Sequence, residues 1–420
     1  MLRIKTIINK LKLQRPALSS LQGGALGMGL LLLLMVFISC VREPELHLYR
    51  SMKAILEFPE VDLDLRVLWD YEIEYGVRYD WEAEWHYGWD EKDYLDHQGP
   101  IGYTKPEVFI LRRYYTGEIP FANHTVAPPN DPPIVGNHFQ GEYEWGFWDI
   151  LVWNNTVSPD GIVSLHFDEA TSLDSVTAFT NPSMVPSRYH APKYTRAFYE
   201  PEALFSAYDQ AMEINRDLEG FDFDAARNVW VKQLNMTLRP ITYICLIELI
   251  LHNNKGRIAQ EIGTGQISGF ARSTNVNSGK GGSEAVSVPF DVRMKRDIPL
   301  LGYYPDDPKV PDATTEYADV LGGRVMTFGI CDIAANKITH SSQVRDPFRH
   351  YMDMDVQFNN GMDSTLVFDI TDQVKKLYKG GVIKVELDMD TVPIPTRPGG
   401  SGFNAVVKDF ENGGTWVIEM

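Results

Sequence analysis

Residues 79–87 alternate aromatic and acidic side chains, and no other pattern in the chain offers as much scope for chemistry. In a strand, alternate side chains point to opposite faces of the sheet. One face then carries Tyr79, Trp81, Ala83, Trp85 and Tyr87, and the other carries Asp80, Glu82, Glu84 and His86. An open aromatic face would be a platform for sugar rings. The acidic face could bind calcium or supply a pair of glycosidase carboxyls.

A simpler interpretation is that the aromatic face fills the interior of a sandwich while the acids face water. A glycosidase needs one carboxyl whose pKa is raised by burial beside an ionised partner. Acids that alternate with a core face are usually all solvated, so we expect no catalysis by Glu82 and Glu84. Glycan binding stays open as an alternative function of this Trp-rich region, with Trp81, Trp85 and Trp89 as the ligand-binding residues.

Other motifs with catalytic or metal-binding chemistry are missing from the sequence. It contains no Gly-x-Ser-x-Gly, His-Glu-x-x-His, Cys-x-x-Cys or EF-hand loop, and its 10 His residues are scattered. The Gly-rich segment 280–283 lacks the spacing of a P-loop. Residues 303–308 and 353–355 could supply calcium oxygens, but exposed acidic turns have the same composition. We therefore expect a protein that is not an enzyme, with no cofactor and no metal.

Charge excludes one class of partner. The chain has 420 residues with 39 Lys and Arg against 57 Asp and Glu, which gives a net charge of -18. So acidic a protein repels phosphate backbones, and nucleic acid is not an expected partner. The length is enough for two domains, each with its own core.

The first 40 residues predict export and a lipid anchor. Residues 1–15 are basic, residues 30–38 are apolar, and Cys40 follows Ser39. The apolar run is too short to span a bilayer as a helix and is typical of a secretory signal. The end of the run resembles a bacterial lipobox, in which the thiol is acylated and becomes the new N-terminus. We expect a signal peptide over residues 1–39, lipidation at Cys40 and a tether over 40–56, which would anchor the protein to a membrane outside the cytoplasm. The alternative is a signal-anchor helix with an incidental cysteine.

The chain contains two further cysteines and two dibasic pairs. Cys245 and Cys331 each lie in an apolar stretch, so we expect buried free thiols rather than a disulfide. Arg112-Arg113 and Lys375-Lys376 are expected to be solvated pairs, open to a trypsin-like protease.

Strand-like patterns dominate the rest of the chain and predict an all-β protein with a few short helices. Alternation begins at residues 61–69, and short runs separated by turn formers recur as far as residue 179. One helix is predicted near residues 201–216, because Pro201 and acidic residues precede a helical stripe. We place an N-terminal sandwich over residues 57–222 and a C-terminal sandwich over 223–420. The apolar run 240–252 is rich in β-branched residues and predicts a central strand.

Several segments resemble a family of uncharacterised outer-membrane lipoproteins from Gram-negative gut anaerobes. They are residues 40–48 (CVREPELHL), 69–72 (WDYE), 112–115 (RRYY), 145–149 (WGFWD) and 187–192 (SRYHAP). Residues 234–252 and 266–270 further resemble the layout of fimbrillin-type proteins. This second resemblance implies two transthyretin-like β-sandwiches in a lipidated precursor that joins fimbriae as stalk, tip or anchor. It implies no catalytic residues.

The resemblance also implies a way of assembling. Fimbrillin-type subunits polymerise when a protease removes a strand and a strand of a neighbour fills the groove. Here Arg66 lies within the first predicted strand rather than in a cleavage loop, which favours an uncut anchor or accessory subunit. Expected partners are the membrane, through the N-terminal lipid, and other fimbrial subunits or surface lipoproteins, with glycans as the alternative. Residues 415–420 are a candidate edge or donor strand.

Overall fold

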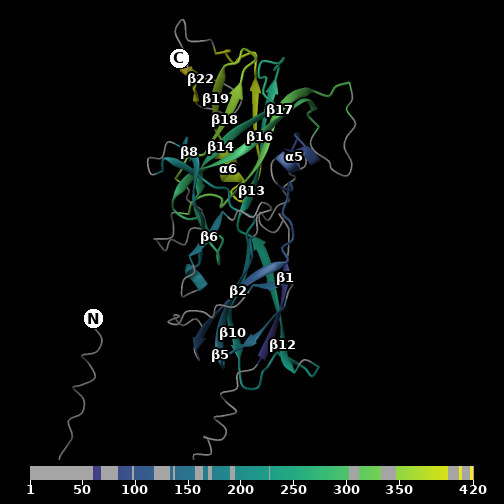
Figure 1. Cartoon of the computed structure of the whole chain (residues 1–420), viewed down its shortest axis with the longest axis vertical. Helices are drawn as coiled ribbons and strands as arrows, with labels where there is room; N and C mark the ends of the chain where they lie inside the picture. Colours follow the sequence, from purple (N-terminus) through teal and green to yellow (C-terminus); the bar gives the residue numbers. More distant parts are fainter. Residues whose placement is uncertain are drawn as a thin grey trace, which may run out of the picture. The chain divides into compact units, whose positions relative to one another are not determined.

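The computed structural model is built mainly of strands (Figure 1). It describes residues 60–67, 84–96, 99–117, 133–135, 138–156, 164–168, 173–189, 194–226, 228–301, 311, 313–332, 347–395, 406–408 and 417–419. The helices among these residues are α5 (Glu91–Asp96), α6 (Thr371–Lys376) and the short 3-10 helix η1 (Leu173–Ser175).

The first sheet has eight strands in the order β3-β2-β5-β10-β12-β1-β4, with β11 pairing β12. Their bounds are β1 (Glu60–Val67), β2 (Val108–Gly117), β3 (Ile134–Val135), β4 (His138–Glu142), β5 (Gly146–Asn154), β10 (Phe205–Ile214), β11 (Asp222–Asp224) and β12 (Val229–Pro240). Buried side chains from β2, β4, β5, β10 and β12 meet in one core. The sheet therefore folds over on itself into a sandwich-like arrangement.

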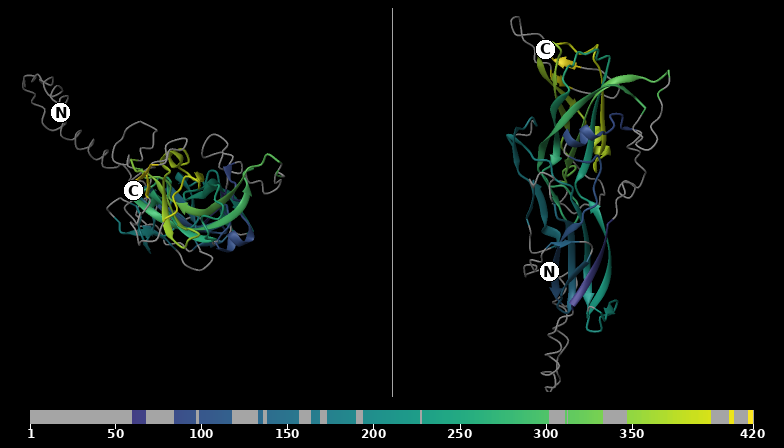
Figure 2. Two further views of the ribbon diagram at one scale, coloured as in Figure 1. Left: turned by 90° about the horizontal axis from the view of Figure 1, so that it is seen from above. Right: turned by 45° about the vertical axis from the view of Figure 1, so that its right-hand side comes forward.

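The second sheet has seven strands in the order β19-β18-β14-β16-β17-β13-β20. Their bounds are β13 (Tyr243–His252), β14 (Ile262–Ala271), β16 (Ala285–Pro299), β17 (Tyr317–Thr327), β18 (Tyr351–Gln357), β19 (Asp363–Asp369) and β20 (Gly381–Asp388). Every strand of this sheet contributes buried side chains to one core, which Val374 of α6 joins. This sheet too wraps around its own interior (Figure 2).

Three small sheets complete the described strands. They are β15-β7-β6, β8-β9 and β21-β22. The bounds are β6 (Leu165–Asp168), β7 (Thr177–Thr180), β8 (Pro182–Pro186), β9 (Arg196–Phe198), β15 (Ser273–Asn275), β21 (Val406–Lys408) and β22 (Val417–Glu419). The predicted all-β class is thus confirmed. The predicted terminal strand is present as β22, paired with β21.

β13 shows why its sequence is apolar almost throughout. Ile247 and Leu249 face the core of the second sheet, whereas Leu246 and Ile250 pack in a separate cluster on the opposite face. A strand buried on both faces reads as a continuous apolar run. The central strand predicted for residues 240–252 is confirmed, with β17 on one side and β20 on the other.

The helix predicted near residues 201–216 is wrong, because residues 205–214 form strand β10. β10 pairs with β5, but the register shifts between Asp209 and Met212. At this bulge Ala211 has a φ of 60°, and its backbone N–H donates to Asp149 Oδ1 at 2.8 Å. The extra residue interrupts the period-two alternation and leaves apolar residues at helical spacing.

Strand pairing also bears on the proposed division between residues 222 and 223. β12 pairs with β1 and β10, so it belongs to the first sheet. Only Ile241 and Thr242 separate β12 from β13 of the second sheet. The division into two sandwich domains stays a prediction, and this pairing argues for a change of sheet at residues 241–242.

The cysteines and the first dibasic pair lie in the interior. Cys245 and Cys331 are buried free thiols, as predicted, and burial raises the pKa of Cys245 to about 12. The prediction of a solvated Arg112-Arg113 pair is wrong, because both residues are buried in β2. Two adjacent arginines in a sequence do not reveal the aromatic rings that lie near them in the fold.

Candidate functional site

Two of the predicted site residues lie outside the described part of the chain, namely Cys40 and Trp81. Lipidation at Cys40 and glycan binding by Trp81 stay predictions. Among the residues that the structure describes, no helix is long and apolar enough to cross a membrane.

Trp85 is fully buried, which is incompatible with the sugar platform predicted for it. It packs with Tyr87 against side chains of β13, β17 and β20, on the face of the second sheet that looks away from the main core. Trp89 is half-buried, and its indole N–H donates to the carbonyl of Gly99 at 3.3 Å. The aromatic residues 85 and 87 therefore fill an interior, which was the simpler interpretation of the sequence.

These aromatic residues belong to a segment that covers the second sheet, which we call the strap. It comprises residues 84–103, of which 97–98 lie outside the described part. In the chain the strap follows β1 and precedes β2, both strands of the first sheet. A Cβ at Gly322 of β17 would lie 2.3 Å from the Tyr87 ring, so the strap approaches the backbone of this sheet closely.

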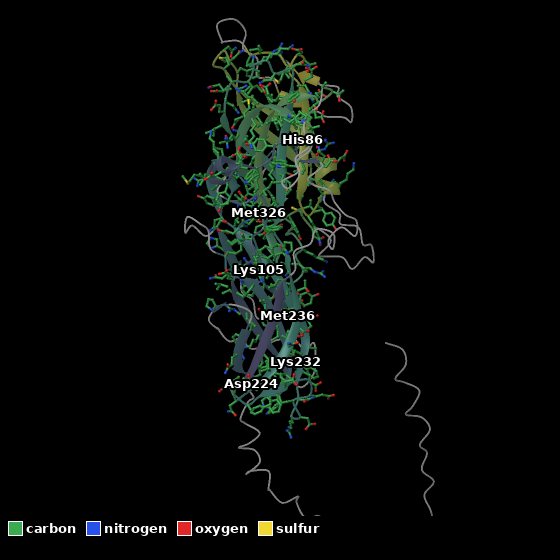
Figure 3. The ribbon with its side chains drawn as sticks, turned by 90° about the vertical axis from the view of Figure 1, so that its right-hand side faces the viewer. His86, Lys105, Asp224, Lys232, Met236 and Met326 are labelled. Carbon is green, nitrogen blue, oxygen red and sulfur yellow. The ribbon has the colours of Figure 1, made fainter. Side chains whose placement is uncertain are left out.

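A buried carboxylate of β13 holds the start of the strap. Glu248 is fully buried; one of its oxygens accepts the backbone N–H of His86 at 3.0 Å, and the other lies 3.1 Å from His86 Nδ1 (labelled in Figure 3). The neighbouring Glu84 pairs with Lys384 of β20 at 3.2 Å. A buried charge is tolerated only with such partners, because an unpaired one is costly.

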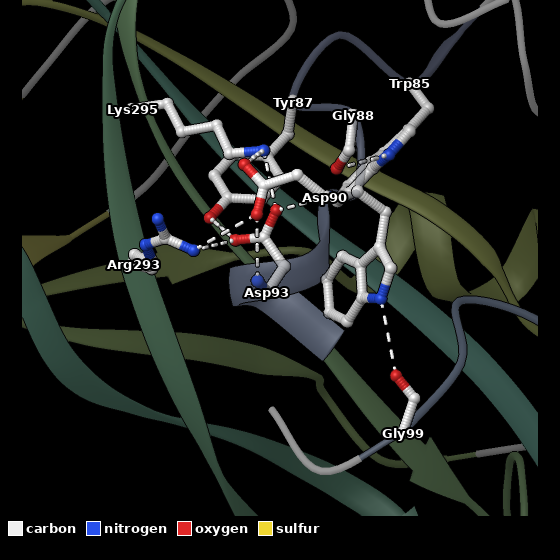
Figure 4. A network of polar contacts seen from close by, with 9 residues as sticks. Trp85, Tyr87, Gly88, Asp90, Asp93, Gly99, Arg293 and Lys295 are labelled. Atoms are coloured by element: carbon white, nitrogen blue, oxygen red, sulfur yellow. Dashed lines mark hydrogen bonds and ion pairs between the residues drawn. The ribbon is translucent and has the colours of Figure 1, made fainter. Parts of the chain in front are cut away.

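A second buried carboxylate, Asp93, holds the middle of the strap (Figure 4). Its oxygens lie 2.8 Å from Arg293 Nη1 and 2.6 Å from Lys295 Nζ, both on β16. Asp93 also accepts the Tyr87 hydroxyl at 2.8 Å, and Lys295 Nζ lies 4.4 Å from the centre of the Tyr87 ring. Burial raises the pKa of Tyr87, and the nearby Asp93 charge raises it further. The phenol is therefore a hydrogen-bond donor at neutral pH.

The local sequence explains why Asp93 sits at this position. The backbone N–H of Asp93 donates to Asp90 Oδ1 at 3.0 Å, and the N–H of Asp90 donates to Asp93 Oδ2 at 2.9 Å. This reciprocal pair caps the N-terminus of α5. The spacing Asp-x-x-Asp was a signal that sequence reasoning missed. A second missed signal was Glu248, a single acid inside an apolar strand.

The first sheet contains the other feature of interest, a slot filled by β1. β1 runs parallel to β12, with Val61 opposite Trp230 and Val67 opposite Leu238. On its other side β1 runs antiparallel to β4, from Glu60 opposite Glu142 to Asp64 opposite His138. Strand β1 thus lies between two strands that come much later in the chain. Of these, β12 can be followed beside β1 in Figure 1.

Arg113 fastens β4 to the opposite layer of the first sheet. Its guanidinium lies 4.6 Å from the centre of the Tyr143 ring, 5.3 Å from that of Phe139 and 5.7 Å from that of Trp148. Its Nη1 also donates to the carbonyl of Glu142, at the end of β4, at 2.5 Å. An aromatic cage of this kind stabilises a desolvated cation. Arg113 of β2 therefore helps to keep β4 in place beside β1.

A side chain covers part of one edge of the second sheet. On β20, the side-chain amide of Gln373 donates to the carbonyl of Lys384 at 2.8 Å and accepts its N–H at 3.0 Å. This side chain from α6 occupies the place that a neighbouring strand would take. On the opposite edge is β19, which pairs with β18.

The acidic residues 353–355 lie in strand β18 rather than in a turn. Asp355 accepts Arg188 Nη2 at 2.6 Å, Thr365 Oγ1 at 2.8 Å and Thr264 Oγ1 at 2.9 Å. Within the described residues, no group of His, Cys, Asp and Glu is arranged to hold a metal ion. These contacts instead fasten the segment that follows β8 to the second sheet.

Asp353 leads to a prediction about pH. Burial raises its pKa from the ordinary 3.8 to about 6, Arg188 opposes this rise, and Asp355 adds to it. Between those values the folded state holds a proton that the unfolded state has released. Asp353 therefore lowers the free energy of unfolding as the pH rises from 3.8 to about 6. In Asp353→Asn this contribution should be absent in urea unfolding measured across the same pH range. Asp363→Asn, at an exposed carboxyl of β19, is the control, and an unchanged pH profile in Asp353→Asn would contradict the assignment.

Comparisons with known proteins give structural likenesses only. No protein-family model matches the chain, and no curated protein matches it. It is similar to a candidate adhesin from Bacteroides ovatus, at 12% identity and a TM-score of 0.42, covering 82% of this chain and 97% of that chain. A candidate adhesin from Bacteroides thetaiotaomicron has 9% identity and a TM-score of 0.42, covering 79% of this chain and 93% of that chain. The fimbrial anchor protein Mfa2 from Porphyromonas gingivalis has 10% identity and a TM-score of 0.35, covering 78% and 90%.

These proteins are of the kind that the sequence resemblance named. At such TM-scores the likeness carries no argument about what this chain does.

Proposed function

We propose that this protein is a cell-surface lipoprotein that acts through β-strand-mediated assembly, as a fimbrial anchor or accessory subunit or as an adhesin component. The observation that supports this most directly is the slot of β1. Its neighbours β12 and β4 offer hydrogen-bonding groups to β1 from both sides. A slot of that kind accepts a strand by main-chain bonds, which is how β-augmentation works.

The position of Arg66 supports an anchor rather than a processed stalk subunit. Arg66 lies inside β1, opposite Thr237 of β12. A protease binds its substrate in an extended, accessible form, so cleavage there would require β1 to leave the sheet first. An uncut chain keeps β1 and, with it, the connection to the lipid proposed at Cys40. The protein would then hold a fimbrial partner at the outer membrane.

The anchor and the assembly can be tested in one cell-surface experiment. We expect the full chain to fractionate with outer membranes and, after mild cross-linking, to purify with other strand-rich surface proteins. The matched variant Cys40→Ser should appear in the soluble fraction, because acyl chains supply the membrane affinity. Membrane retention of Cys40→Ser would refute the lipid anchor. Purification of the monomer alone would refute assembly.

A disulfide between β1 and β4 would distinguish two hypotheses, an anchor that keeps β1 and a subunit that exchanges it for a partner's strand. Asp62 and Gln140 are directly opposed in this antiparallel pair, and Gln140 is exposed. Opposed residues of an antiparallel pair are close enough for a disulfide. The oxidised double variant Asp62→Cys/Gln140→Cys keeps β1 in its slot. An anchor should still capture its partner in this form, whereas loss of the partner on oxidation would indicate that β1 must leave.

Glycan binding is a second candidate, and the described residue that favours it is not one of the three predicted tryptophans. Phe223 of β11 is 49% exposed, and its ring centre lies 5.0 Å from that of Trp230 of β12. Aromatic side chains of this kind can contact sugar rings. The full chain and Phe223→Ala should be compared on a glycan array. Binding that is lost in Phe223→Ala would support this candidate.

A further inference from the structure

We propose that β1 is a force-bearing strand, loaded in shear when the N-terminal segment is pulled away from the second sheet. This inference rests on the proposed N-terminal tether, since a surface anchor is pulled between its membrane attachment and its partner. Three features of the fold support it: the direction of β1, the continuity of β12 with the second sheet, and the contacts of the strap.

The direction of β1 decides how its hydrogen bonds are loaded. β1 and β12 are parallel, so the first residues of both strands lie at the same end of the pair. At the other end, β12 continues through Ile241 and Thr242 into β13. A pull on the N-terminal side of Glu60 and an opposing pull through β13 therefore act on opposite ends of the pair. The two strands must slide past each other, and all bonds of the ladder are loaded together.

The opposing pull reaches β13 at a well-held position. β13 is an interior strand of the second sheet, next to the edge strand β20. Its residues Tyr243–Leu251 pair with β17, and its residues Cys245–His252 pair with β20. The junction is also fixed by side chains. Thr242 Oγ1 accepts the N–H of Leu204 at 2.8 Å, and the carbonyl of Thr242 accepts the hydroxyl of Tyr103 at 2.6 Å. Force applied to the second sheet is thus passed directly to β12.

The strap forms a second attachment behind β1. Along the chain, the pull reaches the strap only after β1 has left its slot. There the chain is held by Glu248 at His86 and by Arg293 and Lys295 at Asp93. Loss of β1 would therefore release the chain only up to residue 84. At roughly 3.3–3.6 Å per residue, residues 60–84 correspond to about 80 Å of contour length.

Single-molecule pulling in two geometries tests the proposal without altering β1. The mature chain from Cys40 onward, produced without lipid, offers its Cys40 thiol as the first handle, because Cys245 and Cys331 are buried. The second handle is Asn359→Cys, exposed in the turn between β18 and β19 of the second sheet, or Ala225→Cys, exposed next to Asp224, which pairs with Val229 at the start of β12. Pulling at Cys40 and 359 shears the pair. Pulling at Cys40 and 225 separates the same pair from one end, one bond at a time.

We expect the first rupture force to be at least twofold higher with the handle at 359 than with the handle at 225. With the handle at 359, the first step should lengthen the chain by about 80 Å less the distance that residues 60 and 84 already span in the fold, and a second step should follow when the strap detaches. Asp93→Asn should lower the force of the second step and leave the first unchanged. Equal rupture forces in the two geometries would overturn the proposal, and so would a first step that Asp93→Asn weakens. The measurement involves no membrane or partner, so its outcome is independent of the assembly experiment.

Discussion

Replacing Asp93 with alanine is expected to lower the free energy of unfolding by about 3–5 kcal/mol. The carboxylate of Asp93 is fully buried, and Arg293 and Lys295 have side-chain exposures of only 12% and 16%. Removing it leaves Arg293 and Lys295 with only the 54% exposed Asp90, at 3.5 Å and 3.2 Å, in place of a buried carboxylate. The Tyr87 hydroxyl loses its acceptor as well. Urea unfolding followed by tryptophan fluorescence measures the change, because Trp85 and Trp89 lie in the strap.

The matched control is Lys92→Ala, at an exposed position of the same helix α5. It should change the free energy of unfolding by no more than about 0.5 kcal/mol. A loss below about 1 kcal/mol in Asp93→Ala would contradict the role given to this carboxylate, since surface ion pairs have energies in that range.

Arg113→Ala is expected to destabilise the protein by about 3 kcal/mol, through the first sheet rather than the second. The substitution removes a charged hydrogen bond to the carbonyl of Glu142, worth about 1.5–3 kcal/mol, and a desolvated cation–π contact worth about 2 kcal/mol. These contributions are not additive, because the same guanidinium makes both. Arg113→Lys keeps the charge but not the planar fork, so its loss should be intermediate.

The control for this substitution is Arg196→Ala, at an exposed arginine of β9. It should leave the denaturation midpoint almost unchanged. Hydrogen exchange adds a local measurement. Amides of β4 should exchange faster in Arg113→Ala, because Arg113 binds the end of that strand. Unchanged protection of β4 would mean that the aromatic cage does not position it.

Strands whose burial follows a simple pattern could be predicted from the sequence. β13 is apolar on both faces because both are covered, and its composition predicts that directly. β10 could not be predicted in the same way. Its bulge at residues 210–211 depends on Asp149 of the neighbouring strand, and no local pattern contains that partner. The result was a false helical stripe.

The strap illustrates a second limit of sequence reasoning. The alternation in residues 79–87 suggests a strand with an aromatic face, and residues 85 and 87 are indeed buried. Their burial depends on β13, β17 and β20, which lie far away in the chain. Asp93 likewise receives its partners from the distant strand β16, and Glu248 of β13 receives its partner His86 from the distant strap. Sequence reasoning identified the segment but assigned a ligand-binding role to a tryptophan that packs in the interior.

The side-chain amide of Gln373 has a consequence for the proposed role of the protein in a surface assembly. By satisfying both main-chain groups of Lys384, it prevents that stretch of β20 from templating a neighbouring molecule. Self-stacking through this border is thereby discouraged even at high surface density. In the proposed assembly, contacts between subunits would therefore form through other parts of the molecule.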